Sequence, residues 1–283
     1  MCACASPDSV SKDQILSFQN KVFNFYESNG RNLPWRMTND AYLILLSEVM
    51  LQQTQVSRVI DYFERWKTRW PTIQNLASAS RQDVLKAWLG LGYNNRGLRL
   101  HQAAKIICKD FGGNVLEAMK HFESIPGVGR YTANAVLIFS SNADVVTVDT
   151  NIRRILIHEF GLCEDISDKE IWEFAFRCLP KHKSRMWHNA LMDFGALELT
   201  SKRTGIRSKT QQSCFEGSNR QIRAKVLRLL LDCSLSFNQI HEGLDIYDVS
   251  DARLQDIVAG MLKDGLLNQD KKSNTFCIRE DSV

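Results

Sequence analysis

Two carboxylate side chains, those of Glu48 and Asp149, are candidates for acid–base chemistry. Glu48 is the one charged residue in the apolar stretch 42–55, which is predicted to be a buried helix, and Asp149 closes the short apolar run 145–148. A buried carboxylate tends to have a raised pKa and can then act as an acid. Asn151, two residues after Asp149, could orient the second carboxylate. A group that protonates a leaving base and an anion that stabilises the sugar cation are what cleavage of a glycosidic bond requires.

Each of these residues also has a structural interpretation. Glu48 could form a hydrogen bond to another helix and have no chemical role. Asp149 could cap the helix that follows it, and Asn151 could bond to the start of the same helix. For Asn151 the structural and the chemical role do not exclude each other.

A short turn at residues 125–129 lies between the two carboxylates in the sequence. It interrupts an apolar pattern with Gly127 and Gly129, and helical spacing resumes at Tyr131. Such a helix–hairpin–helix turn leaves backbone N–H groups of a helix start facing outward, where they can bind a phosphate oxygen. Glycine allows a nucleic-acid backbone to approach closely. A turn of this kind alone is often only a loop, but the turn and Asp149 together favour a DNA-binding interpretation. The hairpin could also hold a monovalent cation.

Polar side chains follow Glu48 and occur again in a glycine-flanked turn further along the chain. Gln52 and Gln53 come just after Glu48, and glutamine bonds well to base edges. Tyr93 lies between Gly92 and Asn94 and could insert between bases, because removing a base from a duplex requires flipping it out. The alternatives are a solvated face for the glutamines and ordinary packing for Tyr93.

Length and composition are those of a globular protein of one or two domains. The chain has 283 residues, of which 44% are hydrophobic and 24% charged, and its net charge is +4. The charge permits a nucleic-acid partner without demanding one. No apolar run is long enough to span a membrane, and no secretory signal is recognised at the N-terminus. The eight cysteines are scattered, which is typical of reduced thiols in an intracellular protein.

Helical periodicity dominates the pattern, so we expect an all-α core made of many short helices. The polar, basic segment 201–221 is predicted to be a linker. Residues 222–283 show three helical patterns followed by a short hairpin, which predicts a winged-helix-like α+β module. This module could bind DNA, or it could be a packing or protein-interaction unit. Its third helix carries Asp251 and Asp256, which suits phosphate binding poorly.

Six segments resemble the helix-hairpin-helix base-excision DNA glycosylases: LPWR, SEVMLQQTQV, GLGY, IPGVGRYTANA, VDTN and LMDFGA. SEVMLQQTQV and GLGY are most similar to the MutY-type adenine DNA glycosylases. The resemblance covers about residues 12–200. It implies a glycosylase core at 1–200 with two helical lobes, one at about 41–148 and one at about 10–40 plus 149–200, with DNA between them.

The resemblance also implies a role for the candidate catalytic residues. Glu48 would protonate N7 of adenine, Asp149 would stabilise the sugar cation, and Asn151 would hold Asp149 in place. Tyr131 stands where the lyase members of the superfamily have a Schiff-base lysine, which implies an enzyme without strong strand cleavage. Arg36 would lie beside the adenine.

Further residues would bind the DNA. Gln53 and Tyr93 would intercalate near the base opposite the excised one. Asn189 falls where the family has a Gln or Glu that faces the adenine. Gly127 and Gly129 would bind a phosphate.

Two departures from the family pattern affect the expected cofactor and specificity. The family usually holds a [4Fe–4S] cluster with four cysteines after the LMDFGA segment, but here Leu199 stands at the first position and Cys214 is the one cysteine in the linker. We therefore expect no cluster, as in the clusterless branch of the family. The usual Nudix-like C-terminal domain, which reads 8-oxoguanine, is replaced by the winged-helix-like module.

The sequence thus predicts a monofunctional glycosylase that removes adenine mispaired with 8-oxoguanine or guanine. Its partner would be double-stranded DNA with a mispaired base, and we expect a monomer that works inside the cell with the DNA. One alternative is a thymine or uracil mismatch glycosylase, since such members also have Tyr at the Tyr131 position. Another is a non-catalytic, damage-sensing DNA-binding protein.

Overall fold

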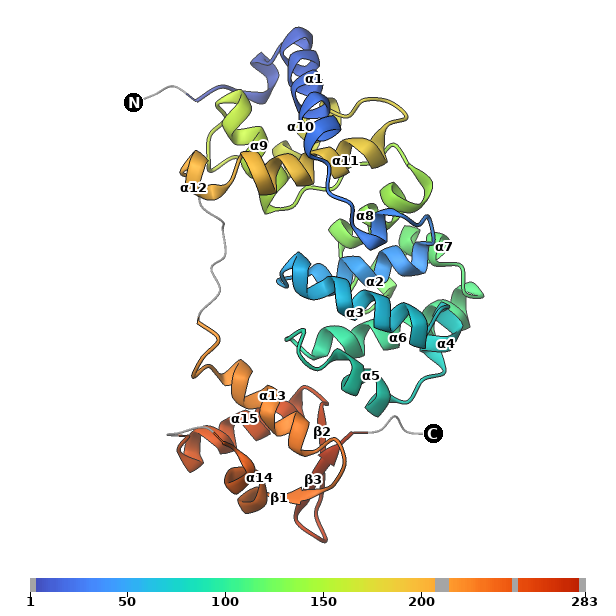
Figure 1. Ribbon diagram of the computed structural model, residues 1–283, viewed down its shortest axis with the longest axis vertical. Coiled ribbons are helices and arrows are strands. Elements are labelled where there is room, and N and C mark those ends of the chain that lie inside the picture. The colour runs from blue at the N-terminus through green and yellow to red at the C-terminus, as the bar shows by residue number, and fades with distance from the viewer. Residues whose placement is uncertain (1–3, 207–213, 246–248, 280–283) are drawn as a thin grey trace. The chain divides into compact units, whose positions relative to one another are not determined.

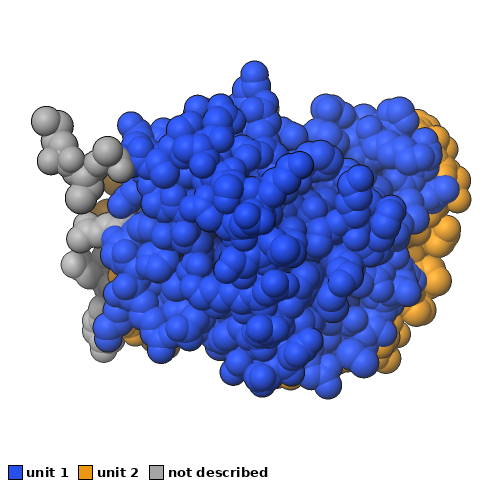
Figure 2. Space-filling view, turned by 90° about the horizontal axis from the view of Figure 1, so that it is seen from above, with its two compact units in different colours: residues 1–48, 114–211 blue, residues 49–113, 212–283 orange. Residues whose placement is uncertain are grey.

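The computed structural model describes residues 4–206, 214–245 and 249–279. The chain divides into two compact units, each made from two separate stretches of sequence (Figure 2). The first unit comprises residues 1–48 and 114–211, and the second comprises residues 49–113 and 212–283. Helix α2 (Ala41–Leu51) begins in the first unit and ends in the second.

The first unit is helical and contains both candidate carboxylates. Its further helices are α1 (Lys12–Asn29), α7 (Val115–Lys120), α8 (Arg130–Ser141), α9 (Thr150–Phe160), α10 (Asp168–Arg177), α11 (Ser184–Asp193), a π-helical turn (Phe194–Glu198) and α12 (Ser201–Thr204), with 3₁₀ turns at Pro7–Ser9, Pro34–Arg36 and Phe122–Ser124 (Figure 1). Buried side chains from α1, α9, α10 and α11 form one apolar core, in which Phe18 and Trp187 pack edge to face with ring centroids 5.5 Å apart.

Local capping fixes where these helices begin. Ser11 and Gln14 form a reciprocal capping box at the start of α1, and Ser167 and Glu170 do the same for α10. Asp149 caps α9 with its side chain. Helix α8 has Gly129 as its N-cap residue, so no capping side chain bonds its first N–H groups.

The second unit combines a helical layer with a small mixed module. Its helices and strands are α3 (Val56–Arg69), α4 (Ile73–Ala77), α5 (Arg81–Trp88), α6 (Asn95–Phe111), α13 (Asn219–Leu229), β1 (Leu235–Ser236), α14 (Phe237–Gly243), α15 (Asp251–Lys263), β2 (Leu267–Asp270) and β3 (Thr275–Ile278) (Figure 1).

The C-terminal module has an antiparallel sheet in the order β1-β3-β2, with Phe276 of β3 facing Leu235 and Gln269. Its elements follow in the order helix, strand, helix, helix, strand, strand. Leu85 of α5 and Leu98 of α6 belong to the same apolar cluster as Ile222 and Val226 of α13. The module is therefore packed on α5 and α6 through a shared core.

The predicted fold class, a mainly helical chain with a small C-terminal α+β module, is confirmed. Three details differ from the expected elements. The helix predicted at 42–55 ends at Leu51, because residues 52–54 turn and Gln53 has a φ of 56°. A strand, β1, precedes the second helix of the module and was not expected. The predicted linker 201–221 contains α12 at its start and the beginning of α13 at its end, while its residues 207–213 lie outside the described residues.

Within the described residues, no helix combines the length and the apolar character that crossing a bilayer requires.

Candidate active site

Glu48, on α2, lies in contact with Tyr131, on α8. The carboxyl group of Glu48 accepts a hydrogen bond from the Tyr131 hydroxyl, and only 6% of Glu48 is exposed. Burial also holds the pKa of the tyrosine well above its ordinary value, and the nearby carboxylates add to this effect. Tyr131 therefore stays a neutral hydrogen-bond donor at any physiological pH.

The pKa of Glu48 is raised from 4.5 to about 7. Burial is the main cause, because a desolvated carboxylate favours its neutral form, and repulsion from the charge of Asp149 acts in the same direction. The hydrogen bond from Tyr131 and the positive charge of Arg36 work against the rise without cancelling it. Glu48 can thus carry a proton near neutral pH and release it to a bound group.

Asp149 caps helix α9 and also presents its carboxylate to a hollow at the protein surface. Its Oδ1 accepts from the backbone N–H of Ile152 at 2.7 Å, and its Oδ2 accepts from Nδ2 of Asn151 at 3.1 Å. Burial raises the pKa of Asp149, and the hydrogen bonds from Ile152 and Asn151 oppose this rise. The carboxylate is half-buried and borders a hollow of about 280 Å³, which is also lined by Arg153 and Trp172.

Asn151 is held in turn by Arg154, one of the two adjacent arginines, Arg153 and Arg154, that follow Asn151 closely in the sequence. Nη2 of Arg154 donates to Oδ1 of Asn151 at 2.7 Å and to the carbonyl of Gly195 at 2.9 Å, while Nε donates to the carbonyl of Leu199 at 2.7 Å. Arg154 is buried, and this burial lowers its pKa. The arginine therefore orients Asn151, and through it Asp149, instead of facing solvent.

Gly195, in the π-helical turn, leaves room for Asn151. A Cβ atom at position 195 would lie 3.0 Å from Cβ of Asn151 and 3.0 Å from Cδ1 of Ile155. The close approach explains a glycine here, since any side chain would press on the residue that orients Asp149.

The apolar run before Asp149 is an extended segment fixed by polar contacts. Asn134 donates its amide to the carbonyl of Val146 at 2.7 Å, and the Thr147 hydroxyl donates to the carbonyl of Tyr131 at 3.1 Å. The Thr147 N–H donates to Nε2 of His188 at 3.2 Å, so the other ring nitrogen carries the proton and donates to the Ser184 carbonyl. Burial lowers the pKa of His188 to about 4, which keeps it neutral. These contacts set the position of Asp149 relative to α8.

Arg36, whose charge acts on Glu48, forms a bidentate ion pair with Asp193. Nη1 of Arg36 lies 2.7 Å from Oδ2 of Asp193, and Nη2 lies 2.8 Å from Oδ1. Arg31 adds hydrogen bonds from its backbone N–H and its Nε. Burial acts to raise the pKa of Asp193, but the bonds from Arg36 and Arg31 outweigh it and lower the pKa. Asp193 lies in the LMDFGA segment, but sequence reasoning assigned it no role of its own. Asn189, on the same helix α11, is buried.

The hairpin at 125–129 has the form that phosphate binding needs. Ile125 and Val128 are buried, and Gly127 and Gly129 are exposed. Gly127 has a φ of 78°, a conformation that favours glycine. A Cβ atom at Gly129 would meet nothing within 4 Å, so the start of α8 is open to an approaching group.

The other three predicted residues, Gln52, Gln53 and Tyr93, belong to the second unit and line one hollow of about 440 Å³. Gln53 and Tyr93 both have positive φ, 56° and 48°. Such backbone conformations are costly for non-glycine residues and persist where the surroundings impose them.

Arg96, which the sequence analysis did not single out, stabilises the positive-φ conformations of Gln53 and Tyr93. Its Nη1 donates to the carbonyls of Val49, at 2.8 Å, and of Gln52, and its Nη2 donates to those of Leu91 and Gly92 at 3.0 Å each. One guanidinium thus ties the end of α2 to the turn that presents Tyr93. Burial lowers the pKa of Arg96 to about 10, so it remains charged at neutral pH.

The segment after α11 does not provide the four thiolates of a [4Fe–4S] cluster. Leu199 is buried in the core of the first unit, and its carbonyl accepts from Arg154. Cys214, the one cysteine of the linker, is exposed. Among the described residues no group of three or more Cys, His, Asp or Glu side chains could hold a metal ion. The residues present therefore do not fit a four-cysteine cluster.

Comparison with known proteins places this site in a family. The profile of the HhH-GPD superfamily base excision DNA repair proteins matches residues 46–181. An adenine DNA glycosylase of Mycolicibacterium smegmatis is 34% identical over 283 residues, covering 92% of this chain and 94% of the relative. The rat adenine DNA glycosylase is 35% identical over 202 residues. The chain spans only 37% to 53% of the length of the mammalian relatives and of one from Buchnera.

A solved structure agrees in fold. A thermostable thymine-DNA glycosylase superposes with a TM-score of 0.64 at 27% sequence identity, covering 68% of this chain and 90% of that one. The fold agrees with the superfamily, and the sequence relatives assign the family within it. The chain belongs to the helix-hairpin-helix base-excision DNA repair superfamily and, within it, to the family of MutY-type adenine DNA glycosylases.

Proposed function

We propose that this chain hydrolyses the N-glycosidic bond of adenine mispaired with 8-oxoguanine or guanine in double-stranded DNA. The observation that carries the proposal is the pair of carboxylates with unequal environments: Glu48 has a pKa of about 7, and Asp149 is held by Ile152 and Asn151. Two carboxyl groups in different protonation states are what acid-assisted glycosidic cleavage needs.

In the proposed reaction Glu48 donates its proton to N7 of the flipped adenine. The bond between C1′ of the sugar and N9 of adenine then breaks, and its electron pair leaves with the base. The charge of Asp149 stabilises the cation that remains on the sugar, and Asn151 and Arg154 fix the direction of that carboxylate. A water molecule adds its oxygen to C1′ and gives up a proton, which leaves an abasic site.

We propose that the enzyme is monofunctional and works without a [4Fe–4S] cluster. Tyr131 carries a hydroxyl group and no amine, so it cannot form the Schiff base through which a lysine supports strand cleavage. The residues after α11 lack the four thiolates of a cluster, as described above. A purified preparation that contains stoichiometric iron would contradict the second statement.

A second candidate, removal of thymine or uracil mispaired with guanine, is favoured by one observation. The solved thymine-DNA glycosylase shares 27% identity and the same fold over 68% of this chain. Against it stands the SEVMLQQTQV segment, which resembles the adenine-specific branch.

The test is base release under single-turnover conditions from duplexes that contain A opposite 8-oxoguanine, A opposite G, T opposite G or U opposite G. We expect adenine release from the first two. Release of thymine or uracil would establish the second candidate and remove the roles given to Arg36 and Asn189. Binding without release from any duplex would indicate a damage-sensing protein. A protein with this activity would work as a monomer in the compartment that holds the DNA.

A further inference from the structure

The C-terminal module and α6 enclose a strongly basic groove within the second unit. Two adjacent hollows, of about 440 and 680 Å³, share Asn95, Arg99 and Asp264 and therefore form one continuous depression. Of the described residues that line them, seven are Arg or Lys and one is Asp. The single aspartate is paired with Arg223. Among these described lining residues, basic side chains therefore outnumber acidic ones by seven to one, and such a surplus of positive charge suits a polyanion.

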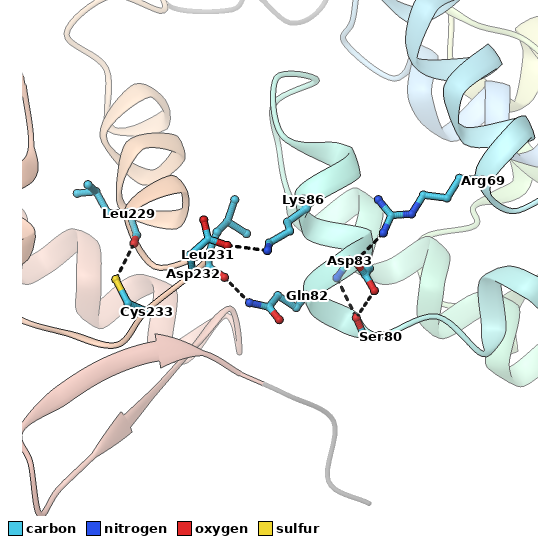
Figure 3. Close-up of polar contacts among 9 residues, drawn as sticks. All are labelled: Arg69, Ser80, Gln82, Asp83, Lys86, Leu229, Leu231, Asp232 and Cys233. Atoms are coloured by element: carbon cyan, nitrogen blue, oxygen red, sulfur yellow. Dashed lines mark hydrogen bonds and ion pairs between the residues drawn. The ribbon is translucent and has the colours of Figure 1, made fainter.

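Polar contacts with α5 fix the position of the C-terminal module, which forms one side of the groove. Besides the shared apolar cluster, Lys86 of α5 lies 2.7 Å from a carboxylate oxygen of Asp232, and Gln82 donates to the carbonyl of Leu231 (Figure 3). Arg81 reaches the module as well, by donating to the carbonyl of Gly265. These contacts fix α13 beside the turn that presents Tyr93.

Arg220, at the start of α13, touches Tyr93 directly. Its Nη1 donates to the Tyr93 hydroxyl at 3.0 Å, and its guanidinium carbon lies 5.3 Å from the centre of the ring. Tyr93 is therefore held from both sides: Arg96 fixes its backbone, and Arg220 fixes its side chain. Of these two arginines, only Arg220 comes from the C-terminal module.

The groove continues away from Tyr93 along α6. Arg99 and Lys105 lie six residues apart on this helix, which separates them by about 9 Å along its axis. That distance corresponds to roughly two or three phosphates of one strand along a duplex axis. Arg279, after β3, lines the same end of the groove. The acidic helix α15 contributes no side chain to either hollow.

We propose that the C-terminal module is a DNA-binding element, that its groove with α6 binds the phosphate backbone next to the Tyr93 wedge, and that Arg220 positions this wedge. The inference rests on the proposed glycosylase function, because only a protein that opens a duplex needs a wedge. In this proposal the module binds DNA through the groove beside Tyr93. Its third helix, which carries acidic side chains, does not take part.

The first experiment measures the affinity of the full chain for a duplex with a 2′-fluorinated, uncleaved adenosine opposite 8-oxoguanine, at salt concentrations between about 50 and 200 mM. Arg99→Ala and Lys105→Ala should each weaken binding and reduce the slope of log K against log salt by about one. Lys109→Ala, on the exposed last turn of the same helix, is the matched control and should leave the slope unchanged. Slopes in Arg99→Ala and Lys105→Ala equal to that of the wild type would overturn the proposed groove and point to an acidic protein partner.

The second experiment follows the wedge through the fluorescence of 2-aminopurine placed beside the mispaired adenine. Arg220→Ala should reduce the fluorescence rise on binding and slow single-turnover release roughly five- to tenfold, the loss expected for one hydrogen bond, without changing the melting temperature. Arg220→Lys, which retains a donor, should restore part of the signal. Arg228→Ala, at an exposed site on the same helix, should behave as the wild type.

The outcomes separate this inference from the proposed function. If the wild type releases no base from any mismatch, the glycosylase proposal fails and the salt slopes still decide whether the groove binds DNA. If the wild type releases adenine but Arg220→Ala gives the same fluorescence and rate, the positioning role is wrong and the glycosylase proposal stands.

Discussion

The Tyr131 hydroxyl donates a hydrogen bond to the carboxyl group of Glu48, and burial sets the pKa of both groups. A tyrosine that stays neutral supplies a fixed donor without adding charge. Glu48 is left with a pKa of about 7, low enough to give up its proton and high enough to carry one at neutral pH. Replacing this tyrosine by lysine would place a cation beside Glu48 and favour its ionised form.

The pH dependence of base release should reflect the two carboxyl groups. Glu48 must be protonated to act, so the single-turnover rate should fall about tenfold per pH unit above about pH 7. Asp149 must be ionised, and its raised pKa should produce a second fall on the acid side. Rates measured from about pH 5 to pH 9 test this. A rate that stays constant up to pH 9 would contradict the role of Glu48 as the acid.

Tyr131→Phe should move the alkaline fall to higher pH. The hydrogen bond from Tyr131 lowers the pKa of Glu48, so its removal raises that pKa, by less than about one unit for a single bond. The same pH series on the variant measures the displacement. Tyr26→Phe, at a half-buried tyrosine of α1, is the control. A fall at the same or a lower pH would show that Tyr131 does not act on Glu48 in solution.

Glu48→Gln should stabilise the fold at neutral pH while abolishing base release. The folded pKa of Glu48 is raised from 4.5 to about 7, so its contribution to stability is complete below about pH 4.5 and is lost as the pH rises to about 7. The glutamine of the variant does not ionise, so the variant does not lose stability over this pH range. Its advantage in the free energy of unfolding should therefore grow between these pH values, by up to about 3 kcal/mol.

Urea unfolding at several pH values measures this difference. Glu123→Gln, the same change at an exposed site, shows the effect of the substitution itself. An advantage that does not vary with pH would mean that Glu48 is not held protonated in the folded chain.

Gly195→Ala should slow base release, although the substitution removes no polar group. The added methyl would meet Asn151 and Ile155 at 3.0 Å and displace the amide that orients Asp149. A displaced catalytic group typically costs about tenfold or more in rate. Ala196→Gly changes an exposed neighbour in the same turn and controls for loosening of the backbone. Equal rates in Gly195→Ala and wild type would remove the positioning role of Asn151.

The sequence was informative where one residue contrasts with its neighbours. A lone carboxylate in an apolar helix and an acid at the end of an apolar run identified Glu48 and Asp149 as candidates. The two glycines of the hairpin were equally visible, because their spacing breaks a periodic pattern. These signals are local, so no knowledge of tertiary contacts was needed.

Residues that act through distant backbone atoms could not be found in this way. In the sequence Arg154 resembles a surface cation. Only in the folded chain does it bond to the carbonyls of Gly195 and Leu199. Arg96 looks like any helix-start arginine, although it bonds the carbonyls at the end of α2 and in the turn before Tyr93. The contact between Arg220 and Tyr93 joins residues 127 positions apart, and no periodicity encodes it.

The most direct test of the account is single-turnover adenine release by Asp149→Asn from a duplex with A opposite 8-oxoguanine. The substitution keeps the shape of the side chain and removes its charge, so the variant should still bind the duplex and release no adenine at a measurable rate. Asp165→Asn, the same change at an exposed site of the first unit, should match the wild type. Equal release by Asp149→Asn and wild type would contradict the proposed mechanism.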